Sequence, residues 1–236
     1  MTDTTFRIAP GEVKSLSGLV ADKLMQSVMS GLLKPGENLV QNDLAARFGV
    51  SRVAIRDALQ ELRIRGLAIN VPQKGTIVRP ITKKRVEELF AVRKLLEPAA
   101  TRLATAKLNS DAKKRLTLLL KKQQLAGEEG DMAQAIDLDW EFHQTIYRAG
   151  GNQALLEMIT ELWSQSRQAR GIAKTDAGWG HQWNRASLSR HRKILSAIKR
   201  GDVDLSSQLV GDGIDAALSE LAVALESTDW WEAEST

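Results

Sequence analysis

The sequence predicts a mainly α-helical protein of two parts, in which three helices and a β-hairpin precede an antiparallel bundle of helices. Apolar residues recur at helical spacing through most of the 236-residue chain. Prolines punctuate the first third, and none follows Pro98. The net charge of +4 lies within residues 1–80, because residues 81–236 carry as many acidic as basic side chains. We therefore expect two domains with a boundary at residue 80.

The first part, residues 1–80, has the pattern of three helices followed by a hairpin. Its first helix carries an apolar face and ends before Pro35 and Gly36. Gly49 ends the second helix, and Ser51 caps the third. The apolar face comprises Leu16, Val20, Leu24 and Val28, further helices are expected over 42–48 and 52–65, and strands over 67–71 and 76–78. This order of elements is that of a winged helix-turn-helix.

The second part, residues 81–236, has the periodicity of successive helices and no convincing strand. Thr82 is placed to cap the first helix, directly after Pro80. The expected helices span 83–107, 110–128, 132–149, 152–173, 181–200 and 203–226. Because short connections favour antiparallel neighbours, we expect an all-α antiparallel helical bundle.

Composition excludes several classes of protein. There is no cysteine, which removes disulfides, thiolate catalysis and zinc-finger ligands. No apolar run approaches the roughly 20 residues that a membrane span needs. The N-terminal residues lack the apolar core of a signal peptide, so we expect a cytoplasmic protein without a membrane partner. A basic first part joined to a neutral second part is typical of a protein that binds a polyanion.

The third predicted helix presents arginines beside its apolar stripe. Arg52, Arg56 and Arg63 lie within about 40° of one another around the helix axis. Because arginine reads guanine or grips phosphate, and a helix N-terminus favours an anion, this face suits DNA. Lys74 stands at the hairpin tip, where it would reach a neighbouring groove or backbone. An ordinary amphipathic helix with a solvated arginine face is the alternative.

The stretch from Leu33 to Val78 resembles the DNA-binding domain of the GntR family almost throughout its length. The matching residues are Pro35, Gly36, Leu39, Leu44, Ala45, Gly49, Val50, Ser51, Arg52, Arg56, Asp57, Ala58, Leu59, Leu62, Gly66, Leu67 and Gly75. The resemblance implies that the residues contacting operator DNA are Asn42, Ser51, Arg52, Arg56, Lys74 and Gly75. Val53 departs from the family's pattern and cannot donate a hydrogen bond from its side chain, so we expect an apolar contact there, as to a thymine methyl.

Polar residues occupy inward positions on three predicted helices of the second part. Asp139 and His143 lie on one apolar stripe, His191 on a second and Arg93 on a third. Burying such groups costs several kcal/mol unless they are paired, bound to a metal or facing a wet cavity. Their number favours a polar pocket. The structural alternatives are a His143–Asp139 hydrogen bond, a satisfied core histidine at 191, and an Arg93–Glu97 pair.

Three segments of the second part resemble the FadR C-terminal (FCD) ligand-binding domain. They are VRKLLEPAATRLA with Arg93, DWEFHQTIYRAGGN with Asp139, His143 and Asn152, and HRKILSAIKRGD with His191. The resemblance implies that one aspartate and three histidines bind a divalent metal, often zinc, and that a small organic acid binds near the arginine. Arg93 and Asn152 are thus the candidate effector-binding residues, with a helix cap as the alternative for Asn152.

The candidate metal site lacks one ligand of that pattern. Asp139, His143 and His191 are present, but Gly213 stands where the last histidine is expected. Zinc can be held by three protein ligands together with water or an anionic ligand. Replacement by Asp212 or His181, and a site without metal, are the alternatives.

These observations predict a DNA-binding transcription regulator of the FadR subfamily, which represses by family habit and is not an enzyme. We expect a homodimer on an inverted-repeat operator, with a small organic acid as effector. One alternative is a metal-independent regulator that responds to acyl-CoA or fatty acids, which Gly213 favours. The other is a metal-dependent hydrolase, which would leave the basic first part unexplained. Core packing, subunit contact or tail docking is expected for Trp179, Trp183, Trp230 and Trp231, and a cofactor or aromatic-ligand role is the alternative.

Overall fold

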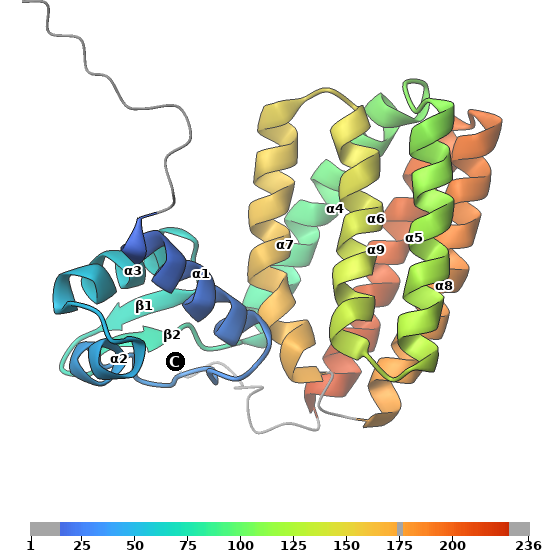
Figure 1. Ribbon diagram of the computed structural model, residues 1–236. Helices are drawn as coiled ribbons and strands as arrows, with labels where there is room; N and C mark the ends of the chain where they lie inside the picture. The colour runs from blue at the N-terminus through green and yellow to red at the C-terminus, as the bar shows by residue number, and fades with distance from the viewer. Residues whose placement is uncertain (1–14, 174–176, 227–236) are drawn as a thin grey trace, which may run out of the picture.

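Figure 1 shows a small head of three helices and a hairpin beside a body of long antiparallel helices. The computed structural model describes residues 15–173 and 177–226. The head contains α1 (Leu16–Met29), α2 (Gln41–Phe48), α3 (Arg52–Ile64), β1 (Ala68–Val71) and β2 (Gly75–Val78). The body contains α4 (Lys83–Thr105), α5 (Ser110–Glu128), α6 (Met132–Ala149), α7 (Gln153–Ala173), α8 (Ala177–Arg200) and α9 (Val203–Glu226). The predicted fold class is confirmed.

Local capping positions the helix-turn-helix within the head. The Ser51 Oγ accepts a hydrogen bond from the Ala54 amide at 3.2 Å and so begins α3. α2 ends at Gly49, whose φ of 65° lies in the left-handed region that glycine adopts without strain. The head has its own apolar core, to which Val20, Leu24, Val28, Leu44, Ile55, Leu59, Leu62 and Leu67 belong. Because α3 buries its apolar side in this core, its side with Arg52 and Arg56 lies at the surface.

The hairpin gains a short third segment that the sequence pattern does not predict. β1 and β2 pair antiparallel, with Ala68 opposite Val78. Asn38 forms a bridge with Ile77, and the Leu39 amide donates a hydrogen bond to a carbonyl of β2 at 2.8 Å. Because only two or three residues take part, no alternation of apolar and polar residues marks this segment.

The helices of the body begin and end within a few residues of their predicted limits, with one larger difference. α8 begins at Ala177, four residues before the predicted start at 181. Gly180 packs against α6, where an added Cβ would lie 2.7 Å from Cγ of Met132. The glycine therefore permits close packing at the start of α8 instead of marking a loop.

The head contacts the body through α7. Gly171 lies against the end of α1, since an added Cβ would overlap the carbonyl oxygen of Met29. One turn earlier, Gln168 Nε2 donates a hydrogen bond to the carbonyl oxygen of Arg79 at 3.2 Å. Arg79 directly follows β2, so α7 contacts both the end of α1 and the base of the hairpin.

Gln165 extends this junction towards α3. Its side-chain amide lies near Gly66, where an added Cβ would be 2.9 Å from Nε2 of Gln165. Gly66 follows α3 by two residues. Arg85 Nη2 donates a hydrogen bond to Oε1 of the same glutamine at 2.6 Å. In the described ranges 15–173 and 177–226, no helix has the length and apolar character needed to cross a membrane.

Candidate functional site

The predicted DNA-contacting residues lie at the surface of the head. All of them are exposed: Asn42 on α2, Ser51, Arg52, Val53 and Arg56 at the start of α3, and Lys74 and Gly75 at the hairpin tip. The side chain of Val53 is 56% exposed, on a different side of α3 from the buried apolar stripe. The Arg56 guanidinium is 3.4 Å from Asp57 in a largely exposed pair, which leaves it accessible to a ligand. This surface offers cations, an apolar side chain and a helix N-terminus together.

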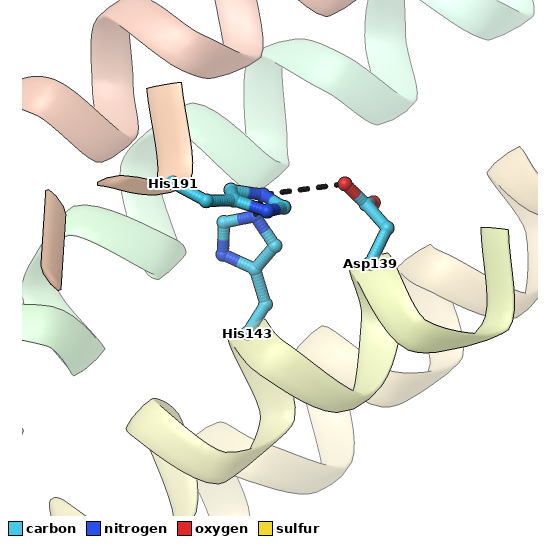
Figure 2. A group of neighbouring side chains, drawn as sticks. All are labelled: Asp139, His143 and His191. Carbon is cyan, nitrogen blue, oxygen red and sulfur yellow. Dashed lines mark hydrogen bonds and ion pairs between the residues drawn. The ribbon is translucent and has the colours of Figure 1, made fainter. Parts of the chain in front are cut away.

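Three predicted metal ligands converge inside the body (Figure 2). Asp139 and His143 lie one turn apart on α6, and His191 reaches them from α8. Their ligand atoms lie within 4.8 Å of one another. The Nε2 atoms of the two histidines are 3.0 Å apart, and His191 Nε2 is 3.2 Å from Oδ1 of Asp139.

A hydrogen-bond chain sets which nitrogen of His143 carries a hydrogen. Tyr147 donates its hydroxyl hydrogen to Oε2 of Glu97 at 2.6 Å. The Tyr147 oxygen is also 3.0 Å from Nδ1 of His143, and it can only accept there. Nδ1 therefore carries the hydrogen of the neutral ring, and Nε2 turns a lone pair towards His191. Burial and the Glu97 carboxylate raise the pKa of Tyr147 well above its ordinary value, which keeps the phenol protonated.

A second chain sets the tautomer of His191. Ser187 donates its hydroxyl hydrogen to Oδ1 of Asp139 at 2.7 Å, so its oxygen accepts from the Gln123 amide at 3.1 Å. The same Gln123 nitrogen donates to Asn184 Oδ1, whose own amide donates to the Gln123 backbone carbonyl. Gln123 therefore turns its oxygen towards Nδ1 of His191 at 3.2 Å. Nδ1 donates there, and Nε2 again presents a lone pair.

Three acceptor atoms thus face one another without a hydrogen between them. Burial lowers the pKa of His143 to about 4 and that of His191 to about 3, so both rings are neutral near pH 7. Asp139 contributes a carboxylate: burial acts to raise its pKa, but His191 and Arg170 lower it below the ordinary value. A cation among these atoms would relieve the repulsion. Metal-ligating histidines typically donate their other nitrogen to a neighbouring acceptor, as both rings do here.

Arg170 on α7 forms an ion pair with Asp139 that the sequence analysis did not anticipate. Its Nη1 is 3.0 Å from Asp139 Oδ2, and the two side chains are 5% and 6% exposed. The guanidinium also lies over Trp163, 4.5 Å from the ring centroid. Burial lowers the pKa of Arg170 to about 10, so it stays charged. Oδ2 of Asp139 is therefore engaged by the arginine, while Oδ1 faces the histidines.

Arg93 forms the structural pair with Glu97 that was one alternative for it. Its Nε lies 2.6 Å from Oε1 of Glu97, and both side chains are buried. The guanidinium stacks on Trp163 at 4.2 Å and on Phe90 at 4.6 Å from the ring centroids. Arg93 also lines the cavity beside the histidines. Its charge is compensated within the core, which weakens its predicted role as the anchor of an effector.

A small cavity of about 30 Å³ adjoins the three acceptors. This is the space of about one water molecule. α9 forms one wall of it with Val210, Gly213, Ile214 and Ala217. An added Cβ at Gly213 would be 3.7 Å from Cδ of Arg190, its nearest neighbour, so the position without a histidine faces an arginine from α8.

Several other predicted candidates lie away from this cavity. Asn152 is exposed and accepts a hydrogen bond from the Leu155 amide at 3.1 Å, so it caps α7 and is not a wall of the cavity. His181 and Asp212 are exposed and lie outside the cluster of ligand atoms. Trp183 is buried against the cavity and stacks on Trp179 with ring centroids 5.7 Å apart. Trp230 and Trp231 fall outside the described residues.

Sequence reasoning missed Arg170, Gln123 and Arg190. Arg170 interrupts the apolar stripe of α7 that contains Ile159 and Trp163, and Gln123 interrupts the stripe of α5. The spacing rule that found Asp139 and the histidines would have found these two as well. Arg190 carries no comparable signal, because it precedes His191 on α8 and is not part of a buried stripe.

Comparison with known proteins is consistent with this arrangement. Residues 16–78 match the family described as bacterial regulatory proteins, gntR family, and residues 88–216 match the FCD domain. The HTH-type transcriptional regulator McbR of Escherichia coli K12 is 31% identical over 189 residues, which cover 80% of this chain and 84% of McbR. The chain belongs to the GntR family of bacterial transcription regulators, with an FCD domain as its body.

Other similar proteins also match most of this chain. A probable D-xylose utilization operon transcriptional repressor of Paenarthrobacter nicotinovorans is 26% identical over 208 residues, covering 88% of this chain and 89% of that protein. The solved structure of E. coli McbR/YncC matches with a TM-score of 0.78 and 26% identity, over 89% of this chain and 99% of the other. A putative GntR regulator from Rhodococcus sp. RHA1 has the same fold, with a TM-score of 0.74, 24% identity, and coverage of 88% and 98%.

Proposed function

We propose that this GntR-family protein is a sequence-specific repressor whose operator binding is modulated by a small organic acid in the body, through a bound divalent metal. The observation that carries the proposal is the convergence of three acceptor atoms, from Asp139, His143 and His191, inside the FCD body of a chain whose head matches the gntR family. Membership of the FadR subfamily stays a prediction, as does the domain boundary at residue 80.

Zinc is the metal that this donor set suits best. Two imidazole nitrogens and one carboxylate oxygen are common zinc ligands, and three protein ligands leave a position for water or an anion. When bound, the metal would supply a positive charge that attracts the carboxylate of an effector. The chain's own contribution is to hold both rings in the ligating tautomer through Tyr147 and Gln123.

A homodimer on an inverted-repeat operator fits the surface of the body. The outer face of α4 carries an exposed apolar stripe, in which Val92, Leu95 and Leu103 are 40%, 74% and 42% exposed. Met158 on the neighbouring helix α7 is 57% exposed. Exposed apolar patches of this kind mark contact surfaces, and a two-fold dimer would present two α3 helices to two half-sites.

α7 provides a physical link between effector and operator. One face of α7 carries Arg170, which contacts Asp139, while Gln168 and Gly171 contact the head. A metal bound by Asp139 would therefore act, through the Arg170–Asp139 ion pair, on the helix that contacts α1 and the hairpin. Such a link can bias the relative position of the two heads.

A metal-independent regulator of acyl-CoA or fatty acids is the second candidate. The glycine at 213 favours it, because it removes one expected ligand. The cavity of about 30 Å³ would have to open widely to admit a long acyl chain, and the paired histidine tautomers would have no purpose. A metal-dependent hydrolase is disfavoured because the matched families and relatives are transcription regulators.

Substitution of the arginines at the start of α3 tests the DNA-binding role. We expect Arg52→Ala and Arg56→Ala each to weaken binding to DNA from the protein's own promoter region by about 1–3 kcal/mol. Fluorescence anisotropy at several salt concentrations measures this loss. Arg115→Ala is the matched control, because Arg115 is an exposed arginine on α5 of the body. This variant is expected to bind DNA as the wild type does. Unchanged binding by both α3 variants would show that this face does not read DNA.

A further inference from the structure

We propose that Arg190 is the residue that selects an anionic ligand in the cavity of the body, and that this ligand is a carboxylate with a short apolar chain. The inference rests on the proposed effector function and names the chemistry of that site. It transfers the role of carboxylate anchor from Arg93, where the sequence resemblance puts it, to an arginine that no sequence pattern marks.

Among the described residues, three arginines line the cavity, and they differ in how firmly each is held. Arg93 pairs with Glu97 and Arg170 pairs with Asp139, and none of these four side chains is more than 6% exposed. Arg190 binds Glu220 through two hydrogen bonds of 2.6 and 3.0 Å.

The Arg190–Glu220 pair is the accessible one. Its side chains are 22% and 29% exposed, so water can solvate both ions when they part. Parting a deeply buried ion pair leaves charges without solvent and costs much more. Arg190 is therefore the lining arginine that can exchange its carboxylate partner for the carboxylate of a ligand.

The wall of the cavity that α9 forms is apolar, and one of its residues is a glycine without a side chain. α9 contributes Val210, Ile214 and Ala217, and Gly213 contributes only backbone. The space beside Gly213 is bounded by the Arg190 side chain, with Cδ 3.7 Å from the position of an added Cβ. Trp183 and Ile194 extend the apolar lining. A cation at the rim above apolar walls suits a ligand with one carboxylate and a short hydrocarbon part.

The size of the cavity makes Arg190 a movable wall. A space of about 30 Å³ holds one water molecule and no organic acid. Rotation of Arg190 away from Glu220 would widen the space between α8 and α9. The same movement would bring the guanidinium to the ligand's carboxylate, so that opening and recognition are one event.

Matched carboxylate and amide pairs test this selection. Acetate, butyrate and hexanoate would each be compared with the corresponding amide, by calorimetry and thermal shift, on protein with and without one equivalent of zinc. We expect wild-type protein to bind at least one acid tenfold or more tightly than its amide. Arg190→Gln is expected to lose this preference, because the amide side chain carries no charge. Arg192→Gln is the control, since Arg192 is exposed and bonds Gln124 on the outer side of α8.

A second pair of variants tests the room beside Gly213. Gly213→Ala adds a methyl group to the cavity wall, whereas Gly211→Ala adds one at the same 3.7 Å contact distance but against Pro98. Both positions lie inside α9, so both variants are expected to fold. We expect Gly213→Ala to weaken binding of the preferred acid at least fivefold and Gly211→Ala to leave it unchanged.

The outcomes separate this inference from the proposed function. Equal preference for acid over amide in Arg190→Gln and in wild type would overturn it, as would wild-type protein that prefers the amides or binds no member of any pair. Acid binding that depends on Arg190 but leaves operator affinity unchanged would support the inference and refute the effector function. Wild-type protein that binds no zinc would refute the proposed metal site. The comparison of Arg190→Gln with wild type could still be made on zinc-free protein.

Discussion

Gln123 is uncharged and is not a metal ligand, yet it determines which nitrogen of His191 faces the cluster. Its side chain is fully buried, and its orientation is set at one end by Asn184 and Ser187. Its other end accepts from His191. The tautomer that leaves a lone pair on Nε2 of His191 is therefore a property of a network that extends from α5 to α8. Mutation of such hydrogen-bond partners typically lowers metal affinity by roughly 10–100-fold.

Replacing Gln123 by a side chain of similar size tests this network. We expect Gln123→Leu to lower zinc affinity by about 10–100-fold, because Nδ1 of His191 loses its acceptor and the ring loses its preferred tautomer. Competition with a chromophoric chelator measures the affinity, and circular dichroism checks the fold.

Gln124→Leu is the matched control for that experiment. Gln124 is the next residue on α5, but it is exposed and bonds Glu128. Its replacement is expected to leave zinc affinity as in the wild type. Equal zinc affinities for the Gln123 and Gln124 variants would mean that the network does not tune the site.

Among the elements, α7 contacts both the cluster of Asp139, His143 and His191 and the head. Its inward face carries Trp163, Ser166 and Arg170 to the cluster, whereas Gln165, Gln168 and Gly171 contact the head. The two faces are adjacent in sequence at Arg170 and Gly171, so a shift of one moves the other. This arrangement requires a glycine at position 171, where α7 lies against the end of α1.

We expect Gly171→Ala to lower the free energy of unfolding by about 1–3 kcal/mol, because the added methyl group collides with a backbone carbonyl that cannot yield without moving α1. Urea unfolding followed by circular dichroism measures the change. Gly211→Ala in α9 is the control: its methyl makes an ordinary contact of 3.7 Å, so helix propensity makes it neutral or slightly stabilising. Equal stability of the two variants would show that the α1–α7 contact is not tight.

At the scale of the whole molecule, net charge is divided unequally between head and body. The excess positive charge lies within residues 1–80, where it suits a polyanion, and the body is neutral overall. The body instead exposes the apolar stripe of α4 that we assign to a second copy of the chain. In the proposed function, the head would provide affinity for DNA and the body would provide the two-fold arrangement that reads two half-sites.

A charge placed in that stripe tests the dimer. We expect Leu95→Asp to yield a monomer in analytical ultracentrifugation at micromolar concentration, and to weaken operator binding by at least tenfold, since one head reads one half-site. Val223→Asp on α9 is the control, because Val223 is 70% exposed and lies outside the stripe. A Leu95→Asp protein with unchanged mass and operator affinity would place the dimer contact elsewhere.

The elements of the fold were accessible from sequence because their signals are local. Periodicity and capping residues such as Ser51 and Thr82 act within one or two turns, and both cap their helices in the structure. The pairing of Asp139 with His143 on one face follows from helical geometry alone. The short segment around Asn38 was missed, since its structure depends on β2, nearly forty residues away.

The sequence by itself determined the order of helices, the surface arginines at the start of α3 and the polar residues of each buried stripe, since each depends on neighbours within a few residues. Only the tertiary structure decided which of these residues meet. In it, His191 lies against Asp139 of α6, and Arg190 lies beside Gly213. Arg93 pairs with Glu97, and Arg170 pairs with Asp139. These contacts depend on how helices distant in sequence are rotated and seated against one another, which is a property of the packed core and not of any local pattern.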